Sequence, residues 1–205
     1  MIDKEKNWEE YKKALLDTGR EGVKELVEYL ENKTDMKTAP ASAKYHLSVE
    51  GGLVQHSLNV KKYIEEIHKE MGLTISPTTL TLVSLLHDIC KTNFYVMGWE
   101  WDKEYKEKTN QWRKLDVWKV EDQLPLGHGE KSVIIVSRFM PLKIEEMLAI
   151  RYHMLCSEGG MLSYPANQAY KGALDKTVLI KLIAIADQMA ELYESTRSIV
   201  EAQEK

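Results

Sequence analysis

Six histidine and aspartate residues, far apart in the chain, are of the types that bind divalent metal ions. His87 and Asp88 follow a mostly apolar run, residues 80–86, which predicts a central helix because a helix that is apolar on every side is buried. An ionised aspartate at the end of such a helix needs a partner charge or a metal ion. An isolated His–Asp pair is also typical of a hydrogen-bonded core histidine, so the remaining four residues decide between the two interpretations. These four are His56, His128, His153 and Asp187.

Two of them lie among aliphatic residues in predicted helices. His56 shares an apolar stripe of the helix predicted over residues 51–71 and therefore points inward, where a single histidine is more often structural than a ligand. Asp187 is the only acidic residue between positions 177 and 190, in the last long helix. Ionising it there is costly unless a positive group faces it. A carboxylate that accepts backbone amide hydrogen bonds is the alternative.

The set as a whole indicates which ions fit. Imidazole with carboxylate favours Mn²⁺, Fe, Co²⁺, Ni²⁺ or Zn²⁺ over Ca²⁺, which prefers an all-oxygen shell, with Mg²⁺ as a further option. Four histidines and two aspartates exceed the needs of one structural zinc, and Cys90 and Cys156 form no zinc pattern. A bridging carboxylate with about three further ligands per ion would make a two-metal site, the kind that clamps a phosphoryl group.

The composition is that of a single soluble domain. The chain has 205 residues, 43% of them hydrophobic, which is enough for one sizeable core. A net charge of −4 does not indicate a polyanion-binding surface, so nucleic acid is expected only as a short substrate. The two cysteines favour a reducing compartment, and no signal segment or membrane-length apolar run is present. We therefore expect a cytoplasmic protein without membrane contact; the sequence does not indicate an oligomeric state.

Helical periodicity dominates the pattern, with one interruption. The predicted helices cover residues 5–31 (divided near Gly19 or Gly22), 51–71, 77–88, 126–140, 143–154 and 177–201, with a short element at 167–174. Residues 92–127 are instead rich in aromatic and β-branched types, which predicts a β-hairpin with a polar tip. Four of the five tryptophans lie in this hairpin. Either they pack across its strands or they form a wall or lid over the pocket.

The order His…His-Asp…Asp on separate predicted helices resembles the HD superfamily of metal-dependent phosphohydrolases. The segment Gly-Gly-Leu-Val-Gln-His-Ser at 51–57 is similar to the family's first-histidine segment. His87-Asp88-Ile-Cys-Lys91 matches its HD-x-x-K form, with Cys90 where many members have glycine, and Asp187 matches the closing aspartate. The two histidines between them resemble the extra ligands of a two-metal branch that includes cyclic-dinucleotide phosphodiesterases and some exoribonucleases. The Gly-Tyr-Pro segment of the bacterial cyclic-dinucleotide enzymes is missing.

This resemblance implies an all-α fold: an HD-domain helical bundle with a small β-hairpin insertion around residues 93–120. It also implies one domain over residues 1–205. Its parts would be N-terminal helices at 1–44, a metal-binding core at 45–190 and the hairpin insertion at 92–127.

The resemblance further implies hydrolysis of a phosphate mono- or diester, on a nucleotide or short oligonucleotide, by metal-activated hydroxide. One ion would be bound by His56, His87, Asp88 and Asp187, and a second by His128 and His153 with Asp88 as the bridge. Asp88 and Lys91 are the predicted catalytic residues, Lys91 by neutralising a phosphate oxygen.

Three further residues are candidates for contacts with the substrate. Lys131, Arg151 and His46 are the candidates, with surface solvation or, for His46, a loop cap as the alternative. Specificity is expected from the hairpin at 92–127 and from the loop at 155–165. The other function open to the chain is a non-catalytic, metal-binding regulatory module that kept the helical scaffold.

Overall fold

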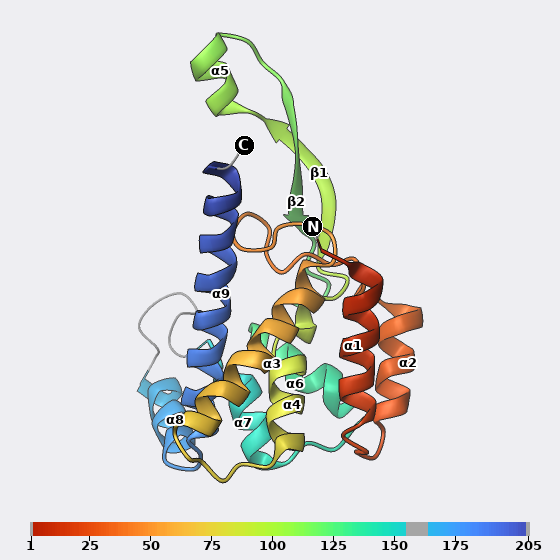
Figure 1. Cartoon of the computed structure of the whole chain (residues 1–205), viewed down its shortest axis with the longest axis vertical. Coiled ribbons are helices and arrows are strands. Elements are labelled where there is room, and N and C mark those ends of the chain that lie inside the picture. Colours follow the sequence, from red (N-terminus) through yellow and green to blue (C-terminus); the bar gives the residue numbers. More distant parts are fainter. Residues whose placement is uncertain (1, 155–163, 204–205) are drawn as a thin grey trace.

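The computed structural model describes residues 2–154 and 164–203, which form a helical bundle with one projecting β-hairpin (Figure 1). Within these residues there are nine α-helices and one two-stranded sheet, so the predicted all-α class with a small hairpin is confirmed. The helices are α1 (Lys4–Leu16), α2 (Val23–Lys33), α3 (Gly52–Glu70), α4 (Pro77–Leu86), α5 (Lys103–Thr109), α6 (His128–Ser137), α7 (Ile144–Tyr152), α8 (Tyr164–Leu174) and α9 (Leu179–Gln203). The strands are β1 (Tyr95–Trp101) and β2 (Lys114–Val120).

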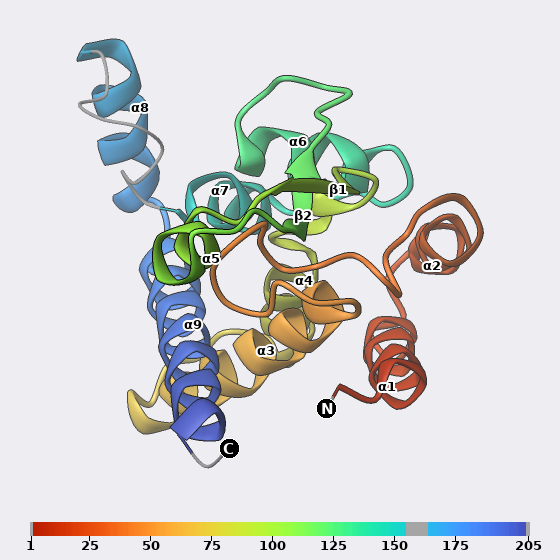
Figure 2. The ribbon, with the colours of Figure 1, turned by 90° about the horizontal axis from the view of Figure 1, so that it is seen from above.

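Helix α4 is the centre of the bundle. Every residue from Thr79 to Leu86 is buried, as the apolar run predicts. Helix α3 packs on α4 and α9, and α7 packs on α4, α6 and α9. The apolar faces of these helices meet in one core, to which α3 contributes Leu53, Val60 and Ile64, and α9 contributes Ile183, Ala186 and Ala190. Seen from above, α1 and α2 stand at one side of the bundle and α8 at the opposite side (Figure 2).

The N-terminal helices support the end of α4. The Trp8 ring of α1 stacks on Tyr11 at 5.7 Å between centroids, and both side chains are fully buried. The Tyr11 hydroxyl donates a 2.8 Å hydrogen bond to the Leu85 carbonyl. The last carbonyls of a helix have no partner within it. Tyr11 therefore fixes the backbone at the point where the chain turns toward His87.

Two glycines allow α3 to begin where it does. Gly51 caps the helix with φ of 78°, in the left-handed region that favours glycine. A Cβ on Gly52 would lie 2.1 Å from the Leu47 carbonyl oxygen, so any larger residue would push the loop away. This close approach sets the start of α3 four residues before His56.

Some predicted helix ends are wrong by a few residues. Helix α6 runs from His128 to Ser137, whereas the predicted helix covers residues 126–140. Helix α4 stops at Leu86, and the chain continues through a 3₁₀ turn, η1 (Ile89–Lys91). His87 and Asp88 therefore lie in a turn after the helix, which lets their side chains face a common centre.

Three tryptophans of the hairpin contact one another at its outer end. Antiparallel pairing places Trp99 opposite Asp116 and Trp101 opposite Lys114, so within the paired strands neither of these two rings faces another aromatic residue. Trp99 contacts Trp101 along the same strand at 5.5 Å between ring centroids, and Trp101 contacts Trp112 on the other arm of the hairpin at 6.0 Å. The polar tip forms helix α5, and the whole hairpin projects away from the bundle and does not fold over it as a lid (Figure 1).

No described helix is both long and apolar enough to cross a membrane.

Candidate metal centre

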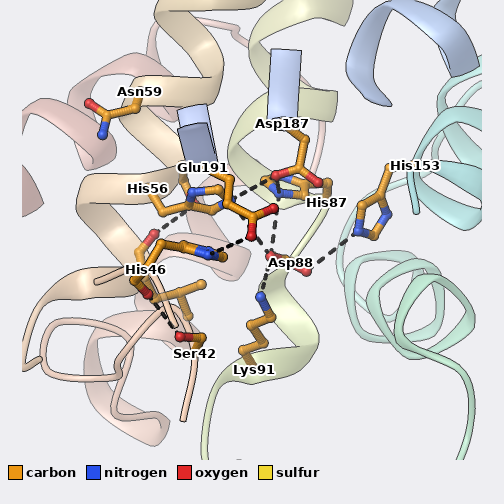
Figure 3. A network of polar contacts seen from close by, with 12 residues as sticks. Ser42, His46, His56, Asn59, His87, Asp88, Lys91, His153, Asp187 and Glu191 are labelled. Atoms are coloured by element: carbon orange, nitrogen blue, oxygen red, sulfur yellow. Dashed lines mark hydrogen bonds and ion pairs between the residues drawn. The ribbon is translucent and has the colours of Figure 1, made fainter. Parts of the chain in front are cut away.

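Four helices deliver histidine and aspartate side chains to one small volume (Figure 3). His56 comes from α3, His87 and Asp88 from the end of α4, His153 from the end of α7 and Asp187 from α9. Ligand atoms of the first three lie within 4.8 Å of one another, and the same holds for His87, His153 and Asp187. The structure thus brings together five of the six predicted ligands.

Backbone geometry fixes which ring nitrogen each histidine presents. His87 Nδ1 lies 2.8 Å from the Ser84 carbonyl, and His153 Nδ1 lies 2.8 Å from the Ile150 carbonyl. A carbonyl only accepts hydrogen bonds, so Nδ1 must carry the proton in both rings. The Nε2 lone pair of each neutral ring is left for a metal ion, which is the arrangement that metal-binding histidines use. Both histidines cap the C-terminus of a helix and bond to its carbonyl three residues earlier, so local structure orients them.

The buried atoms at the centre have the character of a ligand set. His87 Nε2, His153 Nε2 and Asp88 Oδ1 are buried and make no hydrogen bond among the described residues. Buried polar atoms normally have a partner, and leaving one without costs about 1–3 kcal/mol. His153 Nε2 and Asp88 Oδ1 lie 3.5 Å apart, and His87 Nε2 lies 3.4 Å from Asp88 Oδ2. Two nitrogen lone pairs and a carboxylate at these distances fit a divalent cation.

The electrostatics of the centre favour positive charge. Burial opposes ionisation of Asp88, but the Lys91 ammonium, 2.7 Å from Oδ2, together with His87 and His153 outweighs it and holds the pKa of Asp88 well below its usual range. Burial likewise opposes ionisation of Asp187, but the hydrogen bond from His56 lowers its pKa. Both carboxylates are therefore anionic across the physiological range. His56 responds in the opposite direction: burial disfavours its charged form, yet Asp187 and Glu194 raise its pKa to about 10.

Glu194 is a functional residue that the sequence interpretation missed. It is 3% exposed, and both its carboxylate oxygens lie 3.1 Å from His56 Nδ1. Asn59 Nδ2 also donates to it, at 2.7 Å. Glu194 therefore holds the far side of the His56 ring, which turns Nε2 toward Asp187 at 3.0 Å. The signal was its place seven residues after Asp187, two turns along the same face of α9.

His46 lies at the edge of the centre, beside His56. The two rings are 4.9 Å apart between centroids, and His46 Nδ1 is 3.6 Å from a Glu191 carboxylate oxygen. Both ring nitrogens of His46 are buried without a hydrogen bond among the described residues. With His56 and Glu194 it forms another group whose ligand atoms lie within 4.8 Å, although Asn59 already donates to Glu194.

His128 belongs to none of these close groups of described residues, and each of the two predicted phosphate-binding cations has an acidic partner. His128 opens α6, with Nδ1 3.6 Å from Cys90 Sγ, and none of the three close groups of described residues includes it. Lys131 is 3% exposed, and its ammonium binds Asp122 at 2.8 Å. Arg151 forms an ion pair with Glu130. Of the loop predicted to set specificity, residues 155–163 lie outside the described residues.

Comparison with known protein families agrees with this geometry. The family model of the HD domain matches residues 53–192, well over half of the chain. The chain belongs to the HD domain family. This is a superfamily of metal-dependent phosphohydrolases, so the predicted family is confirmed. No curated protein and no solved structure matches the chain. The HD match spans the five clustered residues and Lys91, whereas His46 and Glu194 lie just beyond its two ends.

Proposed function

We propose that this HD protein hydrolyses a phosphate mono- or diester, with a nucleotide or short oligonucleotide as substrate. The observation that carries the proposal is the convergence of three imidazoles and two carboxylates from four helices on one buried point. A structural role does not require such a cluster, because buried charges without partners destabilise a fold. The nucleotide class follows from the two extra histidines, His128 and His153, which resemble those of the two-metal branch.

His56, His87, Asp88 and Asp187 would hold one ion, and His153 faces the other oxygen of Asp88. Asp88 is therefore placed to bridge to a second ion, for which His128 is the remaining ligand that we propose. Bound divalent ions supply Lewis acidity toward the phosphoryl group and lower the pKa of a coordinated water molecule. Nitrogen and oxygen donors together favour Mn²⁺, Fe²⁺, Co²⁺, Ni²⁺ or Zn²⁺.

Lys91 is the residue that we assign to the phosphate. Its ammonium carries three N–H donors, and one of them reaches Asp88 at 2.7 Å. The side chain is 14% exposed, so Lys91 lies at the edge of the buried cluster. Positive charge fixed there stabilises the negative charge that develops on a phosphoryl oxygen.

His46 is the second substrate-contacting residue that we assign. Burial and the neighbouring His56 lower the pKa of His46, so the ring is neutral near pH 7. A neutral imidazole offers one hydrogen-bond donor and one acceptor. Its two buried ring nitrogens therefore suit a sugar hydroxyl or a phosphate ester oxygen beside the metal centre.

The test is hydrolysis of p-nitrophenyl phosphate and bis(p-nitrophenyl) phosphate during titration with Mn²⁺, followed by a nucleotide screen. Asp88→Asn keeps the side-chain volume and should lower kcat/KM more than about a hundredfold, because it removes charge from the bridging ligand. Asp17→Asn, a matched change of an exposed aspartate on α1, should have no effect.

Circular dichroism of both variants checks that the helices are intact. Full activity in Asp88→Asn would overturn the proposal. Tight metal binding without turnover of any ester, nucleotide or oligonucleotide would instead identify a regulatory module on an HD scaffold.

A further inference from the structure

A row of exposed side chains on the hairpin has no part in the metal centre. Residues two apart on a strand share a face, so Tyr95, Met97, Trp99 and Trp101 lie in line along β1. Trp112 continues the line at the tip, 6.0 Å from Trp101 between ring centroids. These five residues are called the hairpin row. Trp99, Trp101 and Trp112 are 45%, 49% and 55% exposed. Leaving three large apolar rings in water costs free energy, and such exposed apolar patches mark interaction surfaces.

Lysines accompany the tryptophans of the row. The Lys114 ammonium lies 4.2 Å from the Trp99 ring centroid, and the Lys106 ammonium 5.6 Å from that of Trp112. Neither lysine forms an ion pair within the described part of the chain, so neither charge is neutralised there. The Lys106 ammonium donates hydrogen bonds to the backbone and side-chain oxygens of Asn110, at 2.8 and 2.7 Å. Asp116, opposite Trp99, is the carboxylate on this face. The net charge of −4 conceals this local pattern of rings and cations.

The inner end of the row adjoins the segment that carries Asp88 and Lys91. Tyr95 begins β1 only four residues after Lys91. Burial raises the pKa of Tyr95, and the charges of Lys91 and Asp88 also act on it. The hairpin row therefore starts four residues from Lys91 and runs outward along β1.

We infer that the hairpin row binds a single strand of nucleic acid, with its bases stacked on the rings and its phosphates at Lys106 and Lys114. One end of the strand would then reach the metal centre. The inference therefore names the substrate class, and it rests on the proposed function for the hydrolysis of that end. DNA and RNA are equivalent ligands for this surface, because rings and ammonium groups contact bases and phosphates and not the sugar.

Spacing and chemistry favour this occupant. Same-face residues of a strand are about 6.8 Å apart, close to the separation of successive nucleotides in an extended single strand. Aromatic rings with interspersed cations are the elements by which proteins bind single strands without reading their sequence. A protein partner would need neither regular spacing nor lysines beside the rings of the row.

Binding is measured by fluorescence anisotropy with metal-loaded protein and fluorescein-labelled phosphorothioate oligothymidylates, which resist hydrolysis. Affinity should rise with length and level off at about four to six nucleotides, the length of the row. Trp99→Ala/Trp101→Ala should weaken binding at least about tenfold. Lys114→Gln should make the affinity less dependent on salt concentration, by the amount expected for the loss of about one phosphate contact.

Val96→Ala/Leu115→Ala changes the opposite face of the same hairpin, where both residues are 42% exposed, and should leave binding unchanged. If the double tryptophan variant does not fold, Trp112→Ala provides the same test outside the paired strands.

Hydrolysis of bis(p-nitrophenyl) phosphate separates this inference from the proposed function. If the protein hydrolyses the ester but the tryptophan changes do not weaken oligothymidylate binding, only the inference about the hairpin row is overturned. Row-dependent binding without any hydrolysis would support the row and overturn the proposed function. Capture of the protein by phosphatidylglycerol vesicles, with no binding of oligothymidylate, would identify a membrane surface and overturn the inference.

Discussion

Replacing Glu194 by glutamine tests whether this carboxylate orients the His56 ring in the metal centre. The side chain is 3% exposed and makes contacts of 3.1 Å to His56 Nδ1 and 2.7 Å to Asn59 Nδ2. Glutamine keeps the volume but has one acceptor oxygen in place of two. Because both neighbours are donors, the new amide group must face one of them. The His56 ring then loses the charge and part of the hydrogen bonding that aim Nε2 at the ion.

The expected loss of metal affinity follows from the position of Glu194 behind the His56 ring. Removing a carboxylate that orients a metal-binding histidine costs about 10- to 100-fold in metal affinity. That is about 1.4–2.7 kcal/mol. Isothermal titration of chelator-treated protein with Mn²⁺ measures it directly. Glu191→Gln is the matched control, because it makes the same change on the same helix at a side chain that is 52% exposed. Solvent screens such a charge, so its effect should stay below about twofold.

Two results would refute the reasoning. If Glu194→Gln binds Mn²⁺ as tightly as the Glu191→Gln control, the buried contact to His56 does not orient a ligand. If affinity falls by more than about a thousandfold, Glu194 is itself a ligand, and the ion lies on the Nδ1 side of His56 with His46.

Three further predictions concern charge and stoichiometry. Lys91→Gln should lower kcat about 10²–10³-fold in the aryl ester assay, and Mn²⁺ affinity in titration should stay the same or rise, because a cation beside Asp88 is removed. His128→Ala should lower the metal content from two ions to one by elemental analysis of purified protein, with the ion at His56 retained. Glu146→Gln should destabilise the fold by about 2–4 kcal/mol in urea unfolding, because the fully buried carboxylate binds Arg20 at 2.7 Å. Burial opposes ionisation of Glu146, but Arg20, the Lys143 amide and the Thr79 hydroxyl together outweigh it and lower the pKa. The stabilisation is therefore complete above about pH 4.3 and is lost as pH falls through the folded-state pKa. Only the wild-type protein should lose this contribution in acid.

Much of the scaffold could be predicted because its signals are local. The apolar run before His87 predicts a buried central helix, and the structure has one from Pro77 to Leu86. The Gly-Gly pair predicts a close backbone approach, found at Gly52. The inward stripe predicts that His56 faces the core, where it is 1% exposed. Each of these depends on helical periodicity or on a glycine, which short stretches of sequence contain.

Other features depend on contacts between distant segments and could not be read from the sequence. Glu194 gains its role only because α3 and α9 pack together, which brings His56 within 3.1 Å across 138 positions of the chain. The pattern of the hairpin predicts strands but not their register, and the register decides that Trp99 faces Asp116 and not another aromatic residue. Lys131 resembled a phosphate-binding cation in sequence; in the structure its ammonium is held by Asp122.

The distribution of buried polar atoms separates the metal centre from the rest of the molecule. Elsewhere in the described residues the fold provides partners for buried polar groups: Glu146 binds Arg20 and Thr79, and the Ser84 hydroxyl donates to the Leu80 carbonyl. Five of the six buried atoms without a hydrogen bond belong to His46, His87, Asp88 and His153. Each costs about 1–3 kcal/mol unless something binds there. The sixth atom is Glu130 Oε2. Because the unsatisfied atoms are concentrated at one point, the described part of the fold gains stability when a cation binds there, so metal binding and folding should be coupled in this protein.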